Sequence, residues 1–463
     1  MIRIVLAIIG SLVIAYAISD HPFYGGEPGF GRGQLVIAIM GCLIALAGFS
    51  PKRIAERVIL AVFSIALMLV LTELALEYAV AARYRPIYQA DDKLIFKLIP
   101  NRSSLMTRSA TNGGETVRHR INANGFRGEE LKSPGSHARV VVYGDSFIHA
   151  PYTADKETFA SVLGDLLTAR TAGLVEVVNA GVSSYGPDQV SSKMELELPV
   201  LRPDLAVVAI FAGNDYGDLM RNKMFRLDAS GALTENAWQL DPTVRMRFNL
   251  SQRESILIRT IRSTMASLRV KRPVKNGVVE ESAITRASDW KFLLTQSDSE
   301  YKEYIVAKNN IVANTHTDYY SADLRLMPNG ESGRYKANMM KAVMGRISDV
   351  SKANDVPLVF VMIPHPVDVI EAYDKWPAID INKYPQFSPR NMITPLEEGA
   401  KSLGVPFVSL YDGFRAIDAN GLYYHYDDDH WNSAGQRKAA EMTLEIATQK
   451  LNERRKGAVK SSR

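Results

Sequence analysis

The sequence predicts an α/β fold with a three-layer, doubly wound parallel sheet, preceded by an apolar N-terminal segment. Two observations indicate the sheet. Five short apolar runs rich in β-branched residues each end in turn residues, and helical patterns lie between them. Such runs are typical of strands buried on both faces, and their alternation with helices is typical of a doubly wound sheet. A third observation is the concentration of apolar residues near the N-terminus, which predicts membrane spans.

Length and composition exclude several classes of protein. The chain has 463 residues, of which 46% are hydrophobic and 23% are charged, a globular mixture and not a disordered or fibrous one. A net charge of +5 is too small to indicate nucleic-acid binding, so we expect no nucleic-acid partner. The single cysteine, Cys42, excludes an intramolecular disulfide framework and a cysteine zinc site. We expect no cofactor and no metal.

Residues 1–84 predict a membrane anchor with about three transmembrane helices. Three apolar runs stand out, over residues 4–18, 35–49 and 58–80. A bilayer span needs roughly 20 residues, and the permissive flanks of the first two runs bring them close to that length. The first run, which ends near Ala15-Tyr16-Ala17, also fits a signal peptide with an A-x-A cleavage site. Both interpretations place the later chain on the same side of the membrane.

Charged residues around the third run predict its orientation. Lys52, Arg53 and Arg57 precede this run, and such a basic loop is typically cytoplasmic. We therefore expect a multi-pass protein of the bacterial inner membrane, with the rest of the chain in the periplasm. Glu73 and Glu77 lie one helical turn apart near the end of the run. They are expected to reach the interface, or alternatively to contact a partner subunit inside the membrane.

Residues 85–463 predict the α/β domain. The five expected strands cover residues 139–143, 174–178, 205–211, 357–363 and 406–410, and the clearest helical patterns cover 158–170, 189–201, 334–353 and 433–454. The third and fourth strands are too far apart for an ordinary crossover, which predicts an insertion at about 216–333.

The insertion contains a strongly basic stretch over residues 245–275. Ser251 and Glu254 have the spacing of a capping box, and apolar residues follow them at helical spacing. The resulting helix either packs on the domain, or forms a lid or a surface that meets anionic lipid or glycan.

Four short blocks of residues that could take part in catalysis lie at or after predicted strand ends. They read Gly144-Asp145-Ser146-Phe147, Asn179-Ala180-Gly181, Gly213-Asn214-Asp215 and Asp427-Asp428-Asp429-His430-Trp431. The carboxyl ends of the strands in an open α/β sheet are where ligands bind. The four blocks are therefore expected to meet at one site.

The residue types in these blocks suit nucleophilic catalysis. A serine on a turn needs a base, and a histidine base needs a carboxylate on its other nitrogen. Ser146 and His430 fill the first two roles, and Asp427, three residues before His430, is the expected carboxylate. The N–H groups of Ser146 and Gly181 and the amide of Asn214 are the expected donors to an oxyanion.

These blocks, in this order, resemble the SGNH (GDSL-type) hydrolase superfamily, in a membrane-anchored bacterial form. The Ser, Gly, Asn and His of the name match Ser146, Gly181, Asn214 and His430, and the D-x-x-H aspartate of the family matches Asp427. The resemblance implies a flavodoxin-like sheet and covers residues 121–450 without the insertion. Here the first block reads GDSF, which is expected to change packing under the helix and not the nucleophile.

Further residues are candidates for support of the site. Asp428 is an alternative to Asp427, because some polysaccharide-acetylating relatives use a D-x-H spacing followed by Trp. Asp145 and Asp215 flank two of the expected site residues, and His365 follows the fourth strand. The bland alternatives are a turn at Ser146, a helix cap at Asn214-Asp215, and a solvated run or cation site at Asp427–Asp429.

The resemblance implies a serine esterase at the outer face of the cytoplasmic membrane. Its expected partners are the lipid bilayer and an acylated glycan or lipid substrate, with acetyl esters of a cell-envelope or exported polysaccharide foremost. An O-acetyltransferase with the same site is the first alternative, working beside a membrane acyltransferase partner. A non-catalytic envelope scaffold is the second alternative.

Overall fold

The computed structural model describes the chain outside residues 20–30, 110–111, 134, 136, 172, 254, 262–288, 307–309, 316, 372, 374–377, 425–427 and 462–463. Two compact units make up the protein. The first joins Met1–Pro86 to Pro242–Pro273, and the second joins Ile87–Asp241 to Val274–Arg463. The predicted anchor ends at residue 84, whereas the first unit continues to Pro86 and takes in part of the predicted insertion.

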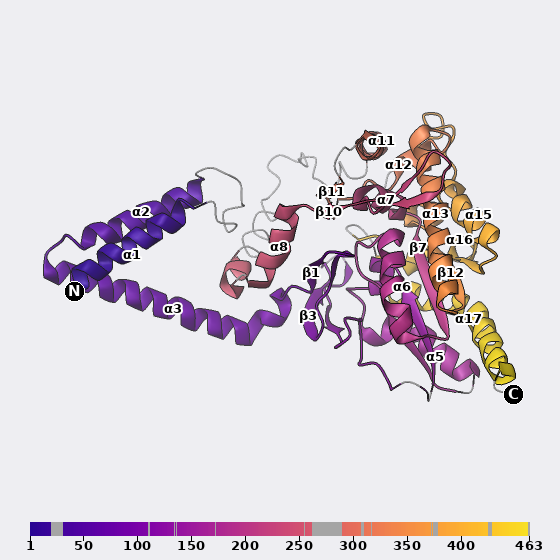
Figure 1. Ribbon diagram of the computed structural model, residues 1–463, viewed down its shortest axis with the longest axis horizontal. Coiled ribbons are helices and arrows are strands. Elements are labelled where there is room, and N and C mark those ends of the chain that lie inside the picture. The colour runs from indigo at the N-terminus through magenta and orange to yellow at the C-terminus, as the bar shows by residue number, and fades with distance from the viewer. Residues whose placement is uncertain are drawn as a thin grey trace. The chain divides into compact units, whose positions relative to one another are not determined.

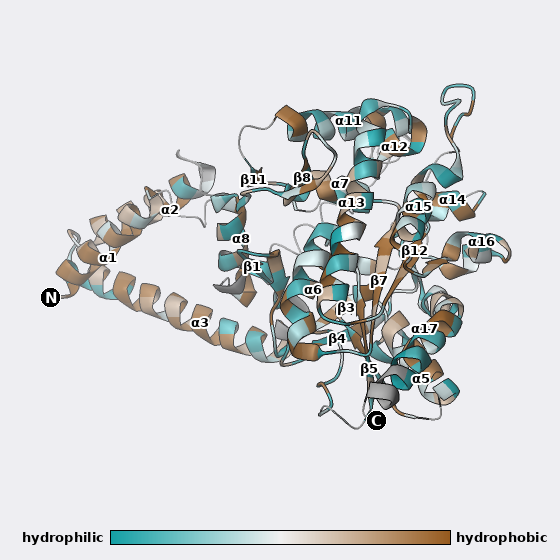
Figure 2. Cartoon of the chain, turned by 45° about the vertical axis from the view of Figure 1, so that its right-hand side comes forward, coloured by the Kyte–Doolittle hydropathy of each residue, from teal (hydrophilic) through white to brown (hydrophobic). Residues whose placement is uncertain are grey.

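The first unit is helical, and its three N-terminal helices are more hydrophobic than its fourth (Figure 2). It contains α1 (Ile2–Ala17), α2 (Arg32–Ala47), α3 (Lys52–Tyr84) and α8 (Pro242–Arg253). Within the described residues one helix is long and apolar enough to cross a membrane, over Lys52–Val80 of α3. The other two apolar helices are shorter, with 16 residues each, so the described structure provides one full-length span where the sequence predicts about three.

Small residues bring α1 and α2 into close contact. A Cβ on Gly10 would lie 2.4 Å from Ala45 N and 2.6 Å from Gly41 O, so only glycine fits at that crossing. Arg3 donates from Nε to Gly48 O at 2.9 Å, which satisfies a carbonyl at the end of α2. Close approach through small residues is the usual way in which apolar helices pack in lipid.

A five-stranded parallel sheet forms the centre of the second unit, in the order β13-β12-β7-β5-β6 (Figure 1). This arrangement confirms the predicted doubly wound α/β fold and all five expected strands. Every residue of β5, β7 and β12 is buried, which explains why these strands read as continuous apolar runs. The strands are β5 (Ala138–Tyr143), β6 (Val175–Asn179), β7 (Leu205–Phe211), β12 (Leu358–Ile363) and β13 (Phe407–Ser409).

Helices cover both faces of the sheet. Right-handed crossovers place the first connecting helix, α5, on the opposite face from α6, α13 and α15. The last helix, α17, packs against α5, while α13 packs against α6 and α15. Their bounds are α5 (Phe159–Thr171), α6 (Pro187–Leu201), α13 (Glu331–Ala353), α15 (Thr394–Leu403) and α17 (Ser433–Ser461). The strand order reverses between β5 and β7, and ligands bind at such a switch point.

Two antiparallel hairpins that the sequence analysis did not predict precede the sheet. They are β1 (Tyr88–Asp91) with β2 (Ile95–Leu98), and β3 (Arg102–Thr107) with β4 (Thr116–Ile121). The strands of β1 and β3 are mostly half-buried. These two strands give little periodic signal, whereas β4 alternates strictly between exposed and buried residues.

Most of the remaining elements lie between β7 and β13. They are α7 (Asp215–Asn222), β8 (Phe225–Leu227), β9 (Leu233–Glu235), β10 (Gln239–Leu240), α11 (Trp290–Val306), β11 (Ile311–Val312), α12 (Ala322–Leu326) and α14 (Pro366–Val369), with α4 (Ser146–His149) and α16 (Leu410–Arg415) elsewhere in the chain.

The predicted capping box in the insertion is wrong. Ser251 lies in the last turn of α8, where its Oγ donates to Phe248 O at 2.7 Å, and Glu254 lies outside the described residues. The chain becomes helical again over residues 256–261, and Ser255 caps this helix by accepting from Ile258 N at 3.3 Å. The rest of the predicted basic helix lies outside the described residues.

Candidate active site

The turn after β5 presents Ser146 at the switch point of the sheet. Asp145 caps α4 by accepting a hydrogen bond from Phe147 N at 2.9 Å, which makes Ser146 the first helical residue. Gly144 permits the tight turn, because a Cβ there would lie 2.7 Å from the Ile148 side chain. The local sequence therefore fixes the backbone around the Ser146 hydroxyl.

His430 joins this hydroxyl to a carboxylate. Its Nε2 lies 2.6 Å from Ser146 Oγ, and its Nδ1 lies 2.6 Å from Asp428 Oδ1. The same oxygen of Asp428 accepts from the backbone N–H of His430 at 2.9 Å, which fixes the turn between the two residues. Asp427, the carboxylate chosen from the sequence, lies outside the described residues. The carboxylate that the described structure places on His430 is Asp428, the alternative.

Burial and nearby carboxylates act in opposite directions on His430. Burial disfavours the imidazolium, but Asp428, Asp429 and Asp145 favour it and together raise the pKa of His430 to about 9. Burial also opposes ionisation of Asp428, yet its contact with His430 holds the pKa of Asp428 below the usual value. The pair is therefore stabilised as an imidazolium and a carboxylate near neutral pH.

Aromatic packing holds the His430 ring in place. The Phe147 ring lies 4.8 Å from it between centroids and is fully enclosed, with Phe211 on the sheet side at 4.3 Å and Trp431 edge-on at 5.1 Å. Phe147, the residue that distinguishes GDSF from GDSL, thus packs its aromatic ring against the His430 ring. This agrees with the expectation that Phe147 changes packing near the site.

A second carboxylate, Asp429, lies between two histidines. Its Oδ1 is 3.9 Å from His430 Nδ1, and its Oδ2 is 3.7 Å from His365 Nε2. His365 is fully buried, accepts from Val367 N at 3.2 Å through Nδ1, and has a pKa that burial lowers. His365 therefore lies behind the site, against Asp429, and not in direct contact with Ser146.

The candidate oxyanion residues differ in whether their polar groups already form hydrogen bonds within the described structure. Gly181 packs against α4, because a Cβ there would lie 2.5 Å from His149 N and 2.8 Å from Ile148 C. Its N–H is already donated to Asn179 Oδ1 at 3.1 Å. Asn214 begins α7, and its buried Oδ1 accepts no hydrogen bond from the described residues.

The two aspartates beside the site residues are buried and support the backbone. Burial raises the pKa of Asp145 to about 6. Burial, with the charges of Asp145 and Asp218, raises the pKa of Asp215 well above its usual value. Asp215 Oδ2 accepts from Phe211 N at 2.8 Å, which ties the start of α7 to the end of β7.

Replacing Gly181 with alanine is expected to reduce both stability and activity. The added methyl collides with the backbone of α4, so the loop and the Ser146 helix must separate, at about 1–3 kcal/mol in unfolding free energy. Chemical denaturation of the detergent-solubilised full chain measures this change. Gly345→Ala is the matched control, since a Cβ there meets nothing within 4 Å. Equal stability of the two variants would contradict the packing role of Gly181.

A buried pair of histidines escaped the sequence analysis. His149, one turn after Ser146, is fully buried. Its Nε2 lies 2.9 Å from His119 Nε2, and its Nδ1 lies 2.7 Å from Ser183 Oγ. Burial, helped by the charge of Arg127, lowers the pKa of both histidines, so they stay neutral. Through Ser183, His149 connects the loop after Gly181 to α4. No local sequence motif predicts this pair of histidines.

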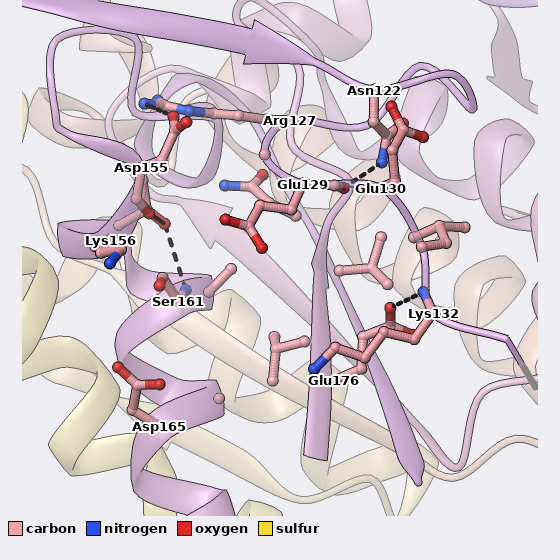
Figure 3. A pocket seen from close by; sticks show the side chains of 18 of the residues that line it. Asn122, Arg127, Glu129, Glu130, Lys132, Asp155, Lys156, Ser161, Asp165 and Glu176 are labelled. Carbon is pink, nitrogen blue, oxygen red and sulfur yellow. Dashed lines mark hydrogen bonds and ion pairs between the residues drawn. The ribbon is translucent and has the colours of Figure 1, made fainter. Parts of the chain in front are cut away.

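A cavity of the described structure lies elsewhere, along β6 (Figure 3). Its volume is about 310 Å³, and charged residues of both signs line it, among them Arg127, Lys132, Asp155 and Glu176. Most of these charges are paired inside the protein, as Arg127 is with Asp155. Neither Ser146 nor His430 belongs to its wall.

Asp428, Asp429 and His430 also form a candidate cation-binding group. Their ligand atoms lie within 4.8 Å of one another. The residues fit a metal poorly. Asp428 Oδ1 is already hydrogen-bonded to His430 Nδ1 and to the backbone N–H of His430. The expectation that the site uses no metal stays a prediction.

The switch point of the sheet and the hydrogen-bonded order of serine, histidine and carboxylate define the class of the second unit. It is an α/β protein with a site of the kind that serine hydrolases share across unrelated folds.

Comparison with solved structures gives matches of low sequence identity and low TM-score. The chain is similar to an α/β hydrolase enzyme from the metagenome of Lake Arreo (13% identity, 68% of this chain, 96% of that chain, TM-score 0.32). It is also similar to a protein of the G-D-S-L family from Desulfitobacterium hafniense (10%, 68%, 99%, 0.29). A third match is a catalytic mutant of an acetylxylan esterase from Geobacillus stearothermophilus (12%, 68%, 95%, 0.33). Neither family models nor curated proteins give a match.

In the order of the four blocks and in the sheet that carries them, the chain resembles the SGNH (GDSL-type) hydrolases.

Proposed function

We propose that the protein is a membrane-anchored serine esterase in which Ser146 is the nucleophile, His430 the general base and Asp428 the carboxylate that orients it. The observation that carries the proposal is the continuous contact from Ser146 Oγ through the His430 ring to Asp428 Oδ1. A serine hydroxyl needs such a base, in its neutral form, to attack an ester.

The geometry supports a two-step mechanism. Ser146 Oγ attacks the acyl carbon while His430 Nε2 accepts the hydroxyl proton, and the carbonyl oxygen becomes an oxyanion. Collapse of this intermediate breaks the bond to the alcohol, which takes the proton from His430. Water then attacks the acyl-enzyme with His430 again as the base, which releases the acid and restores Ser146.

We propose the Ser146 N–H and the Asn214 amide as the principal oxyanion donors. The Gly181 N–H, expected as a third donor, is already donated to Asn179 Oδ1, so Gly181 serves by allowing the loop to approach α4. Donors fixed in advance are worth about 3 kcal/mol each in comparable sites.

The proposed location is the outer face of the bacterial inner membrane. The apolar α3 supports anchoring, and the basic residues before it support an orientation with the second unit in the periplasm. The proposed substrates are esters of short acyl groups, foremost acetyl, on an envelope glycan or lipid.

Covalent labelling tests the proposal on the detergent-solubilised full chain. We expect a fluorophosphonate to add to one serine, found at Ser146 by peptide mass spectrometry, and p-nitrophenyl acetate to be hydrolysed by the unlabelled protein. Labelling without hydrolysis would favour transfer to an acceptor other than water. A folded protein that shows neither reaction would contradict an esterase and favour the scaffold alternative.

A further inference from the structure

Glu73 of α3 binds a segment that lies far away in the sequence. Its carboxylate accepts hydrogen bonds from Ser255 Oγ at 2.7 Å and from the N–H groups of Ile256 and Leu257 at 2.7 and 3.0 Å. Residues 256–261 are helical, so Glu73 satisfies N–H groups that have no acceptor inside that helix. Both partners belong to the first unit. The partner that the sequence placed in another subunit is thus part of the same chain.

This contact lies inside the apolar part of α3. The stretch able to cross a membrane ends at Val80, and at ~1.5 Å per residue Glu73 lies about 10 Å before that end. Amphipathic helices at membrane surfaces lie at a similar depth, about 5–10 Å into the boundary between head groups and acyl chains. The helix at 256–261 therefore meets α3 at interfacial depth.

The contact also explains how α3 carries an acid at this position. A carboxylate that faces hydrocarbon is costly, and such groups are almost always paired. Here the hydroxyl and two backbone N–H groups replace water, and the positive end of a helix matches the negative charge. Glu77, one turn later, pairs with Arg85 near the end of the helix.

The segment itself has the composition of a membrane-surface element. Residues 242–261 contain four arginines, Arg245, Arg247, Arg253 and Arg259, and one acid, Glu254. Arg247 is exposed, and the Ile261 side chain at the far end keeps 50% of its surface exposed. Arginine next to exposed aliphatic residues is the pattern that favours anionic lipid surfaces.

We infer that residues 242–261, although inserted in the chain of the second unit, lie on the membrane surface and bind anionic phospholipid head groups, with Glu73 as the residue that holds them against α3. The inference rests on the proposed membrane anchoring. It gives the protein a second membrane contact, distinct from the apolar helices. The esterase site is thereby tethered to the lipid surface from within its own chain as well as from its N-terminus.

Site-specific fluorescence tests the inference on the full chain reconstituted in vesicles. In a Cys42→Ser background, Ile261→Cys, Leu67→Cys and Ser230→Cys each carry a bimane label. Leu67 lies in the apolar part of α3, and Ser230 lies in the exposed turn between β8 and β9. Quenching by spin-labelled lipid and by aqueous iodide is compared in phosphatidylcholine vesicles with and without phosphatidylglycerol.

We expect lipid quenching at Leu67, iodide quenching at Ser230, and at Ile261 quenching by lipid labelled near the head group, stronger with phosphatidylglycerol and weaker in high salt. Glu73→Ala is expected to raise iodide quenching at Ile261 about twofold or more, because the helix loses its anchor on α3. Glu77→Ala is the matched control and should leave Ile261 unchanged.

The outcomes separate the two claims. If Leu67 is quenched by lipid while Ile261 behaves like Ser230, the inference is overturned and the anchoring stands. If Leu67 itself is reached by iodide and not by lipid, the proposed anchoring fails. If Ile261 is quenched equally with and without phosphatidylglycerol, the claim of anionic head-group binding is overturned.

Discussion

Ser146→Ala is expected to lower kcat for p-nitrophenyl acetate by at least about 10⁴-fold, to the background rate. The alanine removes the only hydroxyl that His430 Nε2 contacts at 2.6 Å in the described structure, so no acyl-enzyme can form. The fold should survive, because Ser146 contributes its backbone to α4 and its side chain only to the site. Initial rates and circular dichroism of the purified full chain measure the two effects.

Ser161→Ala is the matched control for this prediction. Ser161 lies on α5 and lines the cavity along β6, so its loss should leave the rate within about twofold of the parent. A full loss of activity in Ser161→Ala with an active Ser146→Ala would move the reaction to the cavity of Figure 3 and refute the proposed site.

Asp428→Asn is expected to lower kcat/KM by about 10⁴-fold, whereas Asp427→Asn retains most of the activity. An asparagine in place of the carboxylate leaves the contact but removes the charge that orients and stabilises the imidazolium, and a loss of this size follows in a well-studied serine protease. The structure places Asp428 Oδ1 on His430 Nδ1, which is the physical reason for the asymmetry. The opposite result would restore Asp427 as the carboxylate.

The pH dependence gives a second readout of the same pair. Catalysis needs neutral His430 as base, so kcat/KM should rise with pH until the pKa of about 9 is passed. Asp428→Asn removes the group that most favours the imidazolium, so the midpoint of its residual activity should move to lower pH. A pH profile that is flat from neutral to alkaline pH in the parent would contradict the raised pKa of His430.

The sequence predicted the sheet well because the relevant signal is local. β7 and β12 are buried along their whole length, and their composition follows directly from that burial. The positions of Ser146 and His430 followed from the same logic, since both lie just beyond regular elements. The hairpins that contain Tyr88 and His119 were missed, because their strands are short and β1 and β3 show no regular alternation of burial.

The choice between Asp427 and Asp428 shows the limit of spacing arguments. Both positions are compatible with a turn that leads into a helix, and the sequence cannot say which carboxylate the turn directs toward His430. In the structure the Asp428 oxygen accepts from both the ring and the backbone of His430, a geometry that depends on the whole loop. The contact of His149 with His119 likewise joins residues 30 positions apart and leaves no pattern in the sequence.

The 284 positions that separate Ser146 from His430 have a consequence for biosynthesis. A ribosome finishes the strand and turn that carry the serine long before it makes the histidine. Gln436, in the first turn of α17, also holds the turn in place, accepting from Phe159 N at 2.7 Å and donating to Phe147 O at 3.2 Å. Until His430 has been synthesised, Ser146 is an ordinary hydroxyl with no base beside it. Under the proposed function, the nascent chain therefore has no complete site until the residues that precede and begin its last helix have been made.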